Sequence, residues 1–377
     1  MSAMIVPYVN LPLQHRPLKA ALLDAVGRVL DHGQFILGPE VEQFEARFAA
    51  LCGVRFAIGV NSGTDALILA LKALGVGPGD EVITAPNSFV ASASCIGVLG
   101  ARPVFVDVGP DYNLDPNRIE EAITPATRAI LPVHLTGRPA DMDAILDIAR
   151  RHDLRVVEDC AQAVLARTHD RPVGSLGDVG CFSLHPLKTL NACGDGGVIT
   201  TNDPGLAQQF KMLRNIGLRS REDCAVWSHN SRLDTLQAAM LLVKLDLLPA
   251  WTEARRANAR FYQEQLADVV QIPLDRPFEY AVYHTFVVQA EARDALIAHL
   301  AAAGVGAAIH YPAPIHVQAA AASLGYRPAD FPVTMAQAGR IVSLPVYPEL
   351  TVEQAAYVVE QVRSFYDRGP LPGAADA

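Results

Sequence analysis

Short apolar segments alternate with helical patterns along the first half of the chain. Between most of these segments, apolar residues recur every three or four positions, as they do on one face of a helix. This alternation is typical of a mainly parallel sheet covered by helices, so it predicts an α/β fold. We expect the strands at residues 56–60, 81–85, 103–106, 127–132, 155–158, 179–183 and 197–201.

The pattern changes in the second half of the chain. Residues 233–267 are helical with an interruption near Pro249, and beyond them the pattern indicates a strand near residues 283–289 and helices near Arg293 and Thr351. These elements suggest a separate, smaller α+β unit. We predict a large domain over residues 1–250, a smaller C-terminal domain over residues 251–367 and a disordered tail over residues 368–377.

Charge and hydropathy exclude two classes of partner. The 377 residues are 50% hydrophobic and carry a net charge of -9, and they contain no block of lysine or arginine that could follow a nucleic-acid backbone. The most apolar helical stretch, residues 238–250, is interrupted by Lys244, Asp246 and Pro249, which argues against a membrane span. We therefore expect a protein that binds neither nucleic acid nor membrane.

The N-terminus and the cysteines indicate the compartment. The first residues lack the basic start and the apolar run of a secretory signal. The 6 cysteines occur singly, without a CxxC pair and without histidines at metal-ligand spacing. We expect a cytoplasmic protein with reduced thiols and no structural metal.

Lys188 is the candidate catalytic residue. It lies in an apolar, glycine-bounded segment with Leu184, Leu187 and Leu190 as neighbours. Since a buried ammonium group without a partner is costly, this side chain either reaches water or is kept for its amine. A lysine amine in an apolar pocket has a lowered pKa and forms Schiff bases with aldehydes. The second interpretation makes the protein an enzyme.

The turn at Ser62, Gly63 and Thr64 is a candidate phosphate site. It ends a predicted strand and opens directly into an apolar helix. Free N–H groups and the dipole at a helix start bind phosphate, and a glycine lets the backbone approach it. A simple serine or threonine cap is the commoner role for such a turn.

Asp159, Gln162 and Phe89 could surround a planar ligand. Asp159 follows a buried strand, at the edge where open α/β sheets bind ligands, and Gln162 is three residues further on. A carboxylate in this position can hold a proton on a heteroaromatic nitrogen, or it can cap a helix. Phe89 follows another predicted strand, and its ring could stack on a ligand or belong to the core.

Taken together, these segments resemble the DegT/DnrJ/EryC1/StrS sugar aminotransferases, which are fold-type I enzymes that depend on pyridoxal 5′-phosphate (PLP). The resemblance covers nearly the whole chain and implies a mainly parallel seven-stranded sheet between helices. It also implies PLP as cofactor, with pyridoxamine 5′-phosphate (PMP) as the intermediate form. The motifs that carry it are SGTDAL at Ser62, EDCAQA at Glu158, CFSLHPLKTLNACGDGG at Cys181, NSRLDTLQAA at Asn230 and HYPAPIH at His310.

The resemblance implies a role for each candidate residue. Lys188 would form the internal aldimine with PLP and move the proton during amino transfer. Asp159 would keep the pyridine nitrogen protonated, Gln162 would bond the ring hydroxyl, and Phe89 would stack on the ring. The residues implied to hold the phosphate are Ser62, Gly63, Thr64, Ser183 and, reaching across from a neighbouring subunit, Asn230. The active unit would then be a homodimer.

The same resemblance favours amino transfer to a sugar. Relatives with histidine at the position of Lys188 dehydrate sugars, so the lysine indicates a transaminase. We expect a ping-pong reaction that moves an amino group from glutamate or glutamine to a ketosugar, in amino-sugar biosynthesis for a polysaccharide or an antibiotic. The HPLK and GDGG forms around Lys188 favour a nucleotide-linked 3-keto-deoxysugar. A 4-ketosugar nucleotide and a free or phosphorylated keto sugar are alternatives, and a non-catalytic PLP-binding regulatory protein is an alternative of a different class.

Several positions near the substrate also follow from the motifs. Val164 and Leu165 stand where the family usually has histidine and glycine, so we expect them to change the substrate contacts. We find no arginine in the sequence that can be assigned to the carboxylate of the amino donor. The candidate substrate residues are His185, His229, Tyr311 and His316.

Overall fold

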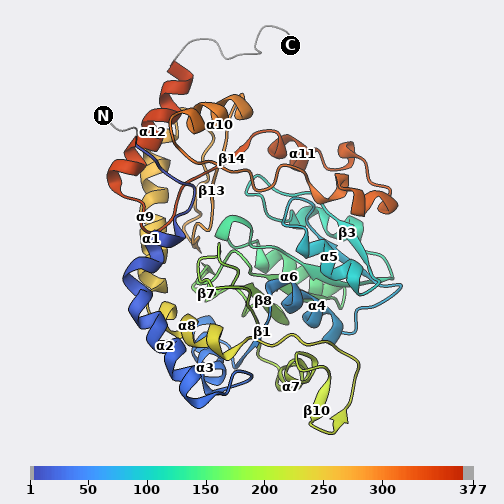
Figure 1. The fold of residues 1–377 in the computed structure, drawn as a ribbon. Coiled ribbons are helices and arrows are strands. Elements are labelled where there is room, and N and C mark those ends of the chain that lie inside the picture. Colours follow the sequence, from blue (N-terminus) through green and yellow to red (C-terminus); the bar gives the residue numbers. More distant parts are fainter. Residues whose placement is uncertain (1–3, 368–377) are drawn as a thin grey trace.

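The computed structural model describes residues 4–367, and its centre is a single sheet of seven strands (Figure 1). The strand order is β1-β9-β8-β5-β4-β2-β3, in which β9 runs antiparallel to both neighbours and the other pairs are parallel. This arrangement confirms the predicted fold class, and each strand end lies within one residue of its prediction. The strands are β1 (Phe56–Val60), β2 (Glu81–Thr84), β3 (Arg102–Phe105), β4 (Thr127–Leu131), β5 (Arg155–Asp159), β8 (Val179–Ser183) and β9 (Gly197–Thr201).

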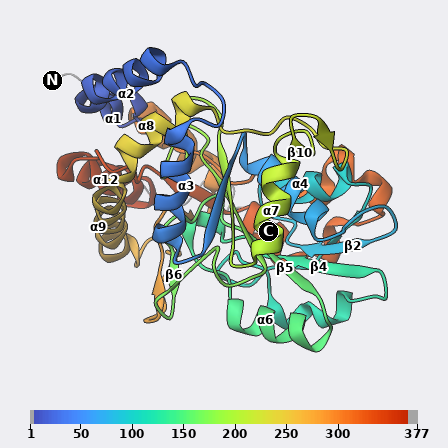
Figure 2. The ribbon, with the colours of Figure 1, turned by 90° about the horizontal axis from the view of Figure 1, so that it is seen from below.

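Helices cover both faces of the sheet because successive residues of a strand point to opposite sides. Val157 packs in the same cluster as α4, α5 and α7, whereas the preceding Val156 packs with α6. Figure 2 shows the sheet between α4 and α7 on one side and α6 on the other. The helices of the first face are α4 (Gly63–Ala73), α5 (Ala91–Val98) and α7 (Pro204–Leu213), and those of the second are α3 (Pro39–Cys52), α6 (Met142–Arg151) and α8 (Thr235–Leu245).

The C-terminal part packs around a small antiparallel pair, β13 (Phe286–Gln289) and β14 (Ile341–Leu344). Its own core includes Val6 from the N-terminal segment, which forms a bridge with Val305. The strand predicted near residue 283 begins three residues later, because Tyr283 has a φ of 48° and cannot be extended. The helices here are α9 (Leu248–Leu266), α10 (Arg293–Ala302), α11 (Pro332–Ala338) and α12 (Val352–Asp367).

The predicted division of the chain after residue 250 stays a prediction, and that position lies inside α9. The predicted tail at residues 368–377 lies outside the described residues. No helix within residues 4–367 is both long and apolar enough to cross a membrane. The remaining elements are α1 (Leu11–His15), α2 (Lys19–His32), and the short strands β6 (Arg167–Thr168), β7 (Arg171–Pro172), β10 (Leu218–Ser220), β11 (Asp223–Cys224) and β12 (Glu279–Tyr280).

The topology of the sheet brings several candidate site residues to one of its edges. Since β1, β2, β4, β5 and β8 are parallel in direction, their carboxyl ends meet at the same edge, where open α/β sheets bind ligands. Ser62 and Phe89 follow β1 and β2, Asp159 ends β5, and Ser183 ends β8. The antiparallel β9 begins at this edge with Gly197, which pairs with both Val60 and Ser183.

Candidate active site

A cavity of about 370 Å³ opens at this edge of the sheet. Its other wall comes from the N-terminal segment at Tyr8 and from the C-terminal part of the chain, including Arg255 on α9 and the segment His284–Thr285. Most of the candidate residues therefore meet in one place, although they come from segments far apart in the sequence. The candidates that line the cavity are Ser62, Gly63, Thr64, Phe89, Asp159, Gln162, Ser183, His185, Lys188 and Tyr311.

The start of α4 is pressed against the end of β8. A Cβ atom added at Gly63 would lie 2.6 Å from Cβ of Ser183, so only glycine allows this approach. The Ser62 hydroxyl caps the helix by accepting a hydrogen bond of 3.1 Å from the Asp65 amide. The first amides of a helix have no partner within it, and the residues at the start of α4 line the cavity together with Ser183. Ser62, Gly63, Thr64 and Ser183 thus form a cup, called the phosphate cup below, that fits the phosphate group of PLP.

Asp159 is a buried carboxylate held in a fixed orientation. It is 4% exposed, and Oδ2 accepts a hydrogen bond of 2.8 Å from the Ser92 hydroxyl while Oδ1 accepts one of 3.1 Å from the Ala161 amide. Burial raises the pKa of this carboxyl group, while the two hydrogen bonds and the Lys188 ammonium act against that rise. A protonated ring nitrogen beside this buried carboxylate would stabilise its charge, and the pyridine of PLP can supply such a nitrogen.

Lys188 lines the cavity from the loop after β8. Its amide donates to the His185 carbonyl at 2.8 Å, which closes a turn and directs the side chain. Burial lowers the pKa of the Lys188 ammonium to about 8, and the Asp159 carboxylate partly opposes this fall. The amine is therefore a better nucleophile near neutral pH than an ordinary lysine, because more of it is unprotonated.

Gln162, Tyr311 and Phe89 form one wall together. The Gln162 side-chain oxygen accepts a hydrogen bond of 2.7 Å from the Thr136 amide, and its nitrogen donates to the Tyr311 hydroxyl at 3.2 Å. The rings of Tyr311 and Phe89 are 5.8 Å apart, and Phe89 is 53% exposed. The exposed ring of Phe89 is free to cover a planar ligand, which a core phenylalanine could not do.

Three of the predicted site residues lie away from the cavity of their own chain. His316 is 3% exposed and packs on Phe331, with 4.6 Å between ring centroids, and burial lowers its pKa. Nε2 of His229 pairs with Oδ2 of Asp65 at 3.1 Å on the surface. Asn230 is exposed and forms a bridge with Asn215. His316 is a buried aromatic contact in this chain, and Asn230 does not line the cavity of its own chain.

Val164 and Leu165 do not line the cavity, which corrects the expectation that they stand beside the ligands and change the substrate contacts. Val164 is 1% exposed and packs in the cluster formed by α3 and α8, where Leu165 joins it with a φ of 71°. The turn that follows Gln162 carries both side chains toward the opposite face of the sheet. Within one chain they influence the core and not the ligand.

Several residues of the cavity gave no signal in the sequence. Ser92 lies on α5, Arg255 on α9, and His284 and Thr285 in the loop before β13. None belongs to a motif that sequence reasoning had singled out. Arg255 in particular reads as one of two adjacent arginines on an amphipathic helix, where a solvent-exposed position is the usual expectation.

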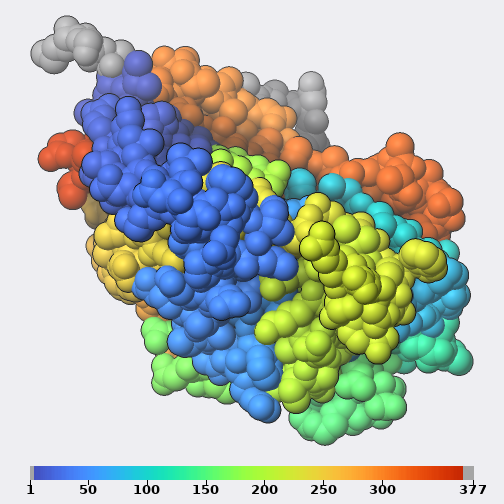
Figure 3. Space-filling view, turned by 60° about the horizontal axis from the view of Figure 1, so that its bottom comes forward, coloured from blue at the N-terminus to red at the C-terminus, as the bar shows by residue number. Residues whose placement is uncertain are grey.

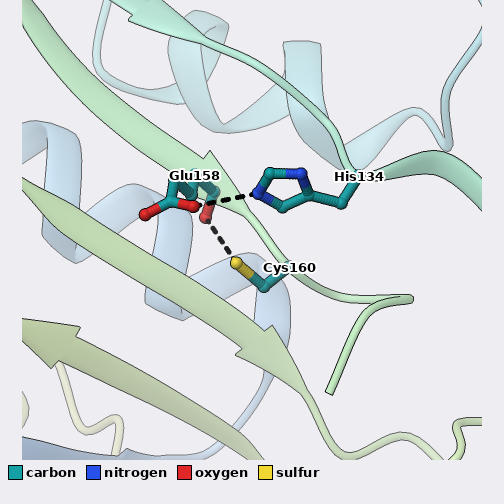
Figure 4. A group of neighbouring side chains, drawn as sticks. All are labelled: His134, Glu158 and Cys160. Carbon is teal, nitrogen blue, oxygen red and sulfur yellow. Dashed lines mark hydrogen bonds and ion pairs between the residues drawn. The ribbon is translucent and has the colours of Figure 1, made fainter. Parts of the chain in front are cut away.

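Within residues 4–367, one group of possible metal ligands lies near the end of β5: His134, Glu158 and Cys160 (Figure 4). Both oxygens of Glu158 are already used, since they accept hydrogen bonds from Nε2 of His134 at 3.0 Å and from three amides of residues 174–177 at 2.8–2.9 Å. Nδ1 of His134 accepts from the Ala140 amide at 3.0 Å. This network braces the end of β5 and thereby fixes the neighbouring Asp159.

Comparisons with known proteins show what this chain is similar to. The model of the DegT/DnrJ/EryC1/StrS aminotransferase family matches residues 17–363. A dTDP-3-amino-3,4,6-trideoxy-alpha-D-glucose transaminase from Streptomyces venezuelae is 44% identical over 366 residues, which cover 96% of this chain and 97% of that protein.

Two solved structures extend the comparison to the fold and the cofactor. S. venezuelae DesV, solved in complex with a ketimine intermediate, is 44% identical with a TM-score of 0.95 and covers 97% of this chain and 100% of its own. NtdA from Bacillus subtilis, solved with bound PMP, is 31% identical with a TM-score of 0.90 and covers 97% of this chain and 86% of its own. The expectations of PLP as cofactor and of an aminotransferase are thereby confirmed. With the match over most of its length, this chain belongs to the DegT/DnrJ/EryC1/StrS aminotransferase family.

Proposed function

We propose that this aminotransferase moves an amino group from glutamate or glutamine to a ketosugar, and that the acceptor is a nucleotide-linked 3-keto-deoxysugar. The observation that carries the proposal is that Lys188 and Asp159 line one cavity together with the N-terminus of α4. The similarity to a transaminase named for a dTDP-3-amino sugar supports this acceptor, as do the HPLK and GDGG forms around Lys188.

The cavity residues would hold the cofactor in one orientation. PLP, when bound, would supply an electron sink next to the carbon that gains or loses the amino group. Asp159 would hold the proton on the ring nitrogen, Gln162 would contact the ring hydroxyl, and Phe89 would cover one face of the ring. The phosphate would lie in the cup formed by Ser62, Gly63, Thr64 and Ser183.

Lys188 would carry the proton transfer. With a pKa of about 8, roughly a tenth of the Lys188 side chains are neutral at pH 7 before any ligand binds. The neutral amine would take a proton from the α-carbon of the donor and return one to the carbon of the acceptor. Since donor and acceptor would share one cavity, they would bind in turn, which is the basis of ping-pong kinetics.

We further propose a homodimer in which Asn230 completes the phosphate cup of the partner. Asn230 is exposed and does not line the cavity of its own chain. Nearby, large apolar side chains are exposed on the segment before it, and Trp227 is 89% exposed. Figure 3 shows the segment around residues 204–230, in lime to yellow, at the surface beside the N-terminal helices in blue. A second copy of the chain would cover these apolar groups.

The test is a screen of keto sugars against the PMP form of the enzyme. We expect a nucleotide-linked 3-ketosugar to restore the absorbance of the PLP form, and related 4-ketosugar nucleotides and free or phosphorylated keto sugars to do so more slowly. If one of these sugars converts the PMP form faster, that sugar and not the 3-ketosugar would be assigned as the acceptor. A purified protein that PLP cannot reconstitute, or one that binds PLP without turning over any keto sugar, would favour the regulatory alternative.

A further inference from the structure

Four buried polar atoms without hydrogen-bond partners belong to residues that line the same cavity. They are Nε of Arg255, Nδ1 of His284, Oγ1 of Thr285 and the hydroxyl of Tyr347. Buried polar atoms are almost always paired, so each unpaired one needs an explanation. Because all four residues line one cavity, a ligand bound there could supply the missing partners.

Arg255 is the charged member of this group. Its side chain is buried, with the residue 7% exposed, and within residues 4–367 its hydrogen bonds are two long ones of 3.5 Å to the carbonyl oxygens of Tyr283 and His284. Burial lowers the pKa of Arg255 to about 10, and the charge of the Glu349 carboxylate partly opposes this fall, so the guanidinium is still charged at neutral pH. Glu349 makes no hydrogen bond to Arg255, so a buried cation with so few hydrogen-bond partners would be stabilised by an anion that binds it directly.

The other three groups belong to segments that contact Arg255 or its helix, and all of them line the same cavity. Its bonds to the carbonyls of Tyr283 and His284 place it beside the segment that carries Thr285. Asn258 is three residues after Arg255 on α9 and donates to the Tyr347 carbonyl at 3.1 Å, so Tyr347 packs against the same helix. Burial, and after it the charges of Lys188 and Arg255, lowers the pKa of His284 well below its ordinary value, so this histidine is neutral.

We propose that Arg255, together with Thr285 and Tyr347, binds the α-carboxylate of the amino donor. The proposal rests on the proposed function, and it assigns the donor to the class of α-amino acids instead of simple amines. A guanidinium binds a carboxylate with two parallel hydrogen bonds, and the two hydroxyls can each donate one more.

Size and position favour a carboxylate over the other anions of the reaction. The cofactor phosphate already has its own cup at the start of α4, on the sheet side of the cavity. The diphosphate of a nucleotide sugar is bulky, whereas Arg255 is nearly inaccessible at 7% exposure inside a cavity of about 370 Å³. The cavity therefore admits a small anion to Arg255.

The first experiment measures the two half-reactions separately by stopped-flow absorbance. With Arg255→Gln we expect the dissociation constant of L-glutamate, or of L-glutamine if that is the donor, to rise on the order of 100-fold in the PLP form. The dissociation constant of the ketosugar, measured with the PMP form, should change much less. The proposal would be overturned if the dissociation constant of the donor stayed within twofold of wild type. An equal rise in the dissociation constants of donor and ketosugar would also overturn it.

Arg256 provides the matched control on the same helix. Its guanidinium lies over the Tyr280 ring and bonds the Ala281 carbonyl, away from the cavity. Arg256→Gln should leave the donor constant unchanged. If Arg255→Gln does not fold, Arg255→Lys and Thr285→Val keep the test open, and each should weaken donor binding about 10-fold. Unchanged donor binding in both would reject the carboxylate site.

A binding measurement separates this proposal from the proposed function. Calorimetric titration of the PLP-loaded protein with glutarate, which has the carboxylates of glutamate but no amino group, needs no turnover. We expect wild type to bind glutarate and Arg255→Gln to lose most of that affinity. Equal binding by both proteins would reject the Arg255 site even if the enzyme transfers amino groups. Wild type that binds glutarate through Arg255 but transfers no amino group would instead reject the proposed function.

Discussion

The Ser92 hydroxyl donates a hydrogen bond of 2.8 Å to Oδ2 of Asp159. Both groups are buried, and the bond joins α5 to the end of β5 across one face of the sheet. Burial raises the pKa of Asp159 and the Ser92 bond lowers it, so the bond favours the ionised carboxylate. The relationship makes Ser92 a positioning residue for Asp159.

Replacing Ser92 with alanine should therefore weaken cofactor binding. Without the hydroxyl, the Asp159 pKa rises further and the carboxylate loses part of its hold on the ring nitrogen. We expect the dissociation constant of PLP to rise roughly 10-fold, which fluorescence titration of the apoprotein would measure. Ser94→Ala, an exposed position two residues away, is the control. Equal affinity in Ser92→Ala would show that Ala161 alone orients Asp159.

Lys188→Met should abolish amino transfer while leaving the fold intact. We expect kcat to fall roughly 10³-fold or more, because both the covalent anchor and the proton carrier are lost. Borohydride reduction of the PLP-loaded wild type should attach the cofactor to the peptide containing Lys188, as mass spectrometry would detect. Undiminished turnover in the variant would refute the assignment.

Stability should change in the opposite direction from activity in Lys188→Met. The folded-state pKa of about 8 lies below the ordinary 10.5, so the unfolded chain binds more protons between these values and stability rises with pH across that window. Below pH 8 the buried ammonium destabilises the fold. We expect the apo variant to melt above apo wild type at pH 7, and this gain should disappear above about pH 10. A lower Tm at pH 7 would contradict the burial of the amine.

Reconstitution of the apoprotein should depend on pH through Lys188. The neutral amine reacts with PLP, so the rate of reconstitution should rise with pH and level off above an inflection near 8, the pKa of this amine. Asp159 raises that pKa, so in Asp159→Asn the inflection should move to lower pH. The measurement is the growth of cofactor absorbance between about pH 6 and 10. An inflection at the ordinary lysine value would mean that the amine is solvated.

Gly63→Ala should disrupt the phosphate cup. The new Cβ would lie 2.6 Å from Cβ of Ser183, so the start of α4 or the end of β8 must move. We expect at least about a 10-fold loss of PLP affinity, which equilibrium dialysis would measure. Gly27→Ala is the control, because a Cβ on that glycine of α2 meets nothing within 4 Å.

Mixing two inactive variants tests the shared site. If Asn230 serves the partner's cavity, a dimer of Lys188→Ala with Asn230→Ala contains one site that has both native residues. Random mixing after reversible dissociation should then recover about a quarter of wild-type activity, since half of the dimers are mixed and each has one native site. Activity that stays at the level of the separate variants would place Asn230 in the site of its own chain or outside it.

Much of the site could be predicted from the sequence because its central residues stand at the ends of buried strands. Ser62, Asp159 and Ser183 each follow or end an apolar segment, and the rule that carboxyl ends of parallel strands meet at one edge brings them together without knowledge of the packing. Lys188 was recognisable for a similar local reason, as a charge in an apolar segment. The motifs then gave the family.

The structure decided the contacts that depend on distant segments. Arg255, Thr285 and Ser92 carry no local signal, since an arginine, a threonine or a serine on a helix or in a loop is ordinary until another part of the chain packs over it. Conversely, His316 and Val164 stand at motif positions but lie in packed clusters, because a motif fixes where a residue stands along the chain and not which side of the backbone faces the cavity.

The sequence by itself determined the α/β fold and the family, and it singled out Lys188 and Asp159 as candidate site residues, because hydrophobic periodicity, strand ends and short motifs are local properties. Only the tertiary structure decided which side chains close the cavity from the C-terminal part. Those side chains meet the sheet edge through long-range packing, and no short stretch of sequence encodes the burial that leaves Arg255 charged and nearly without partners.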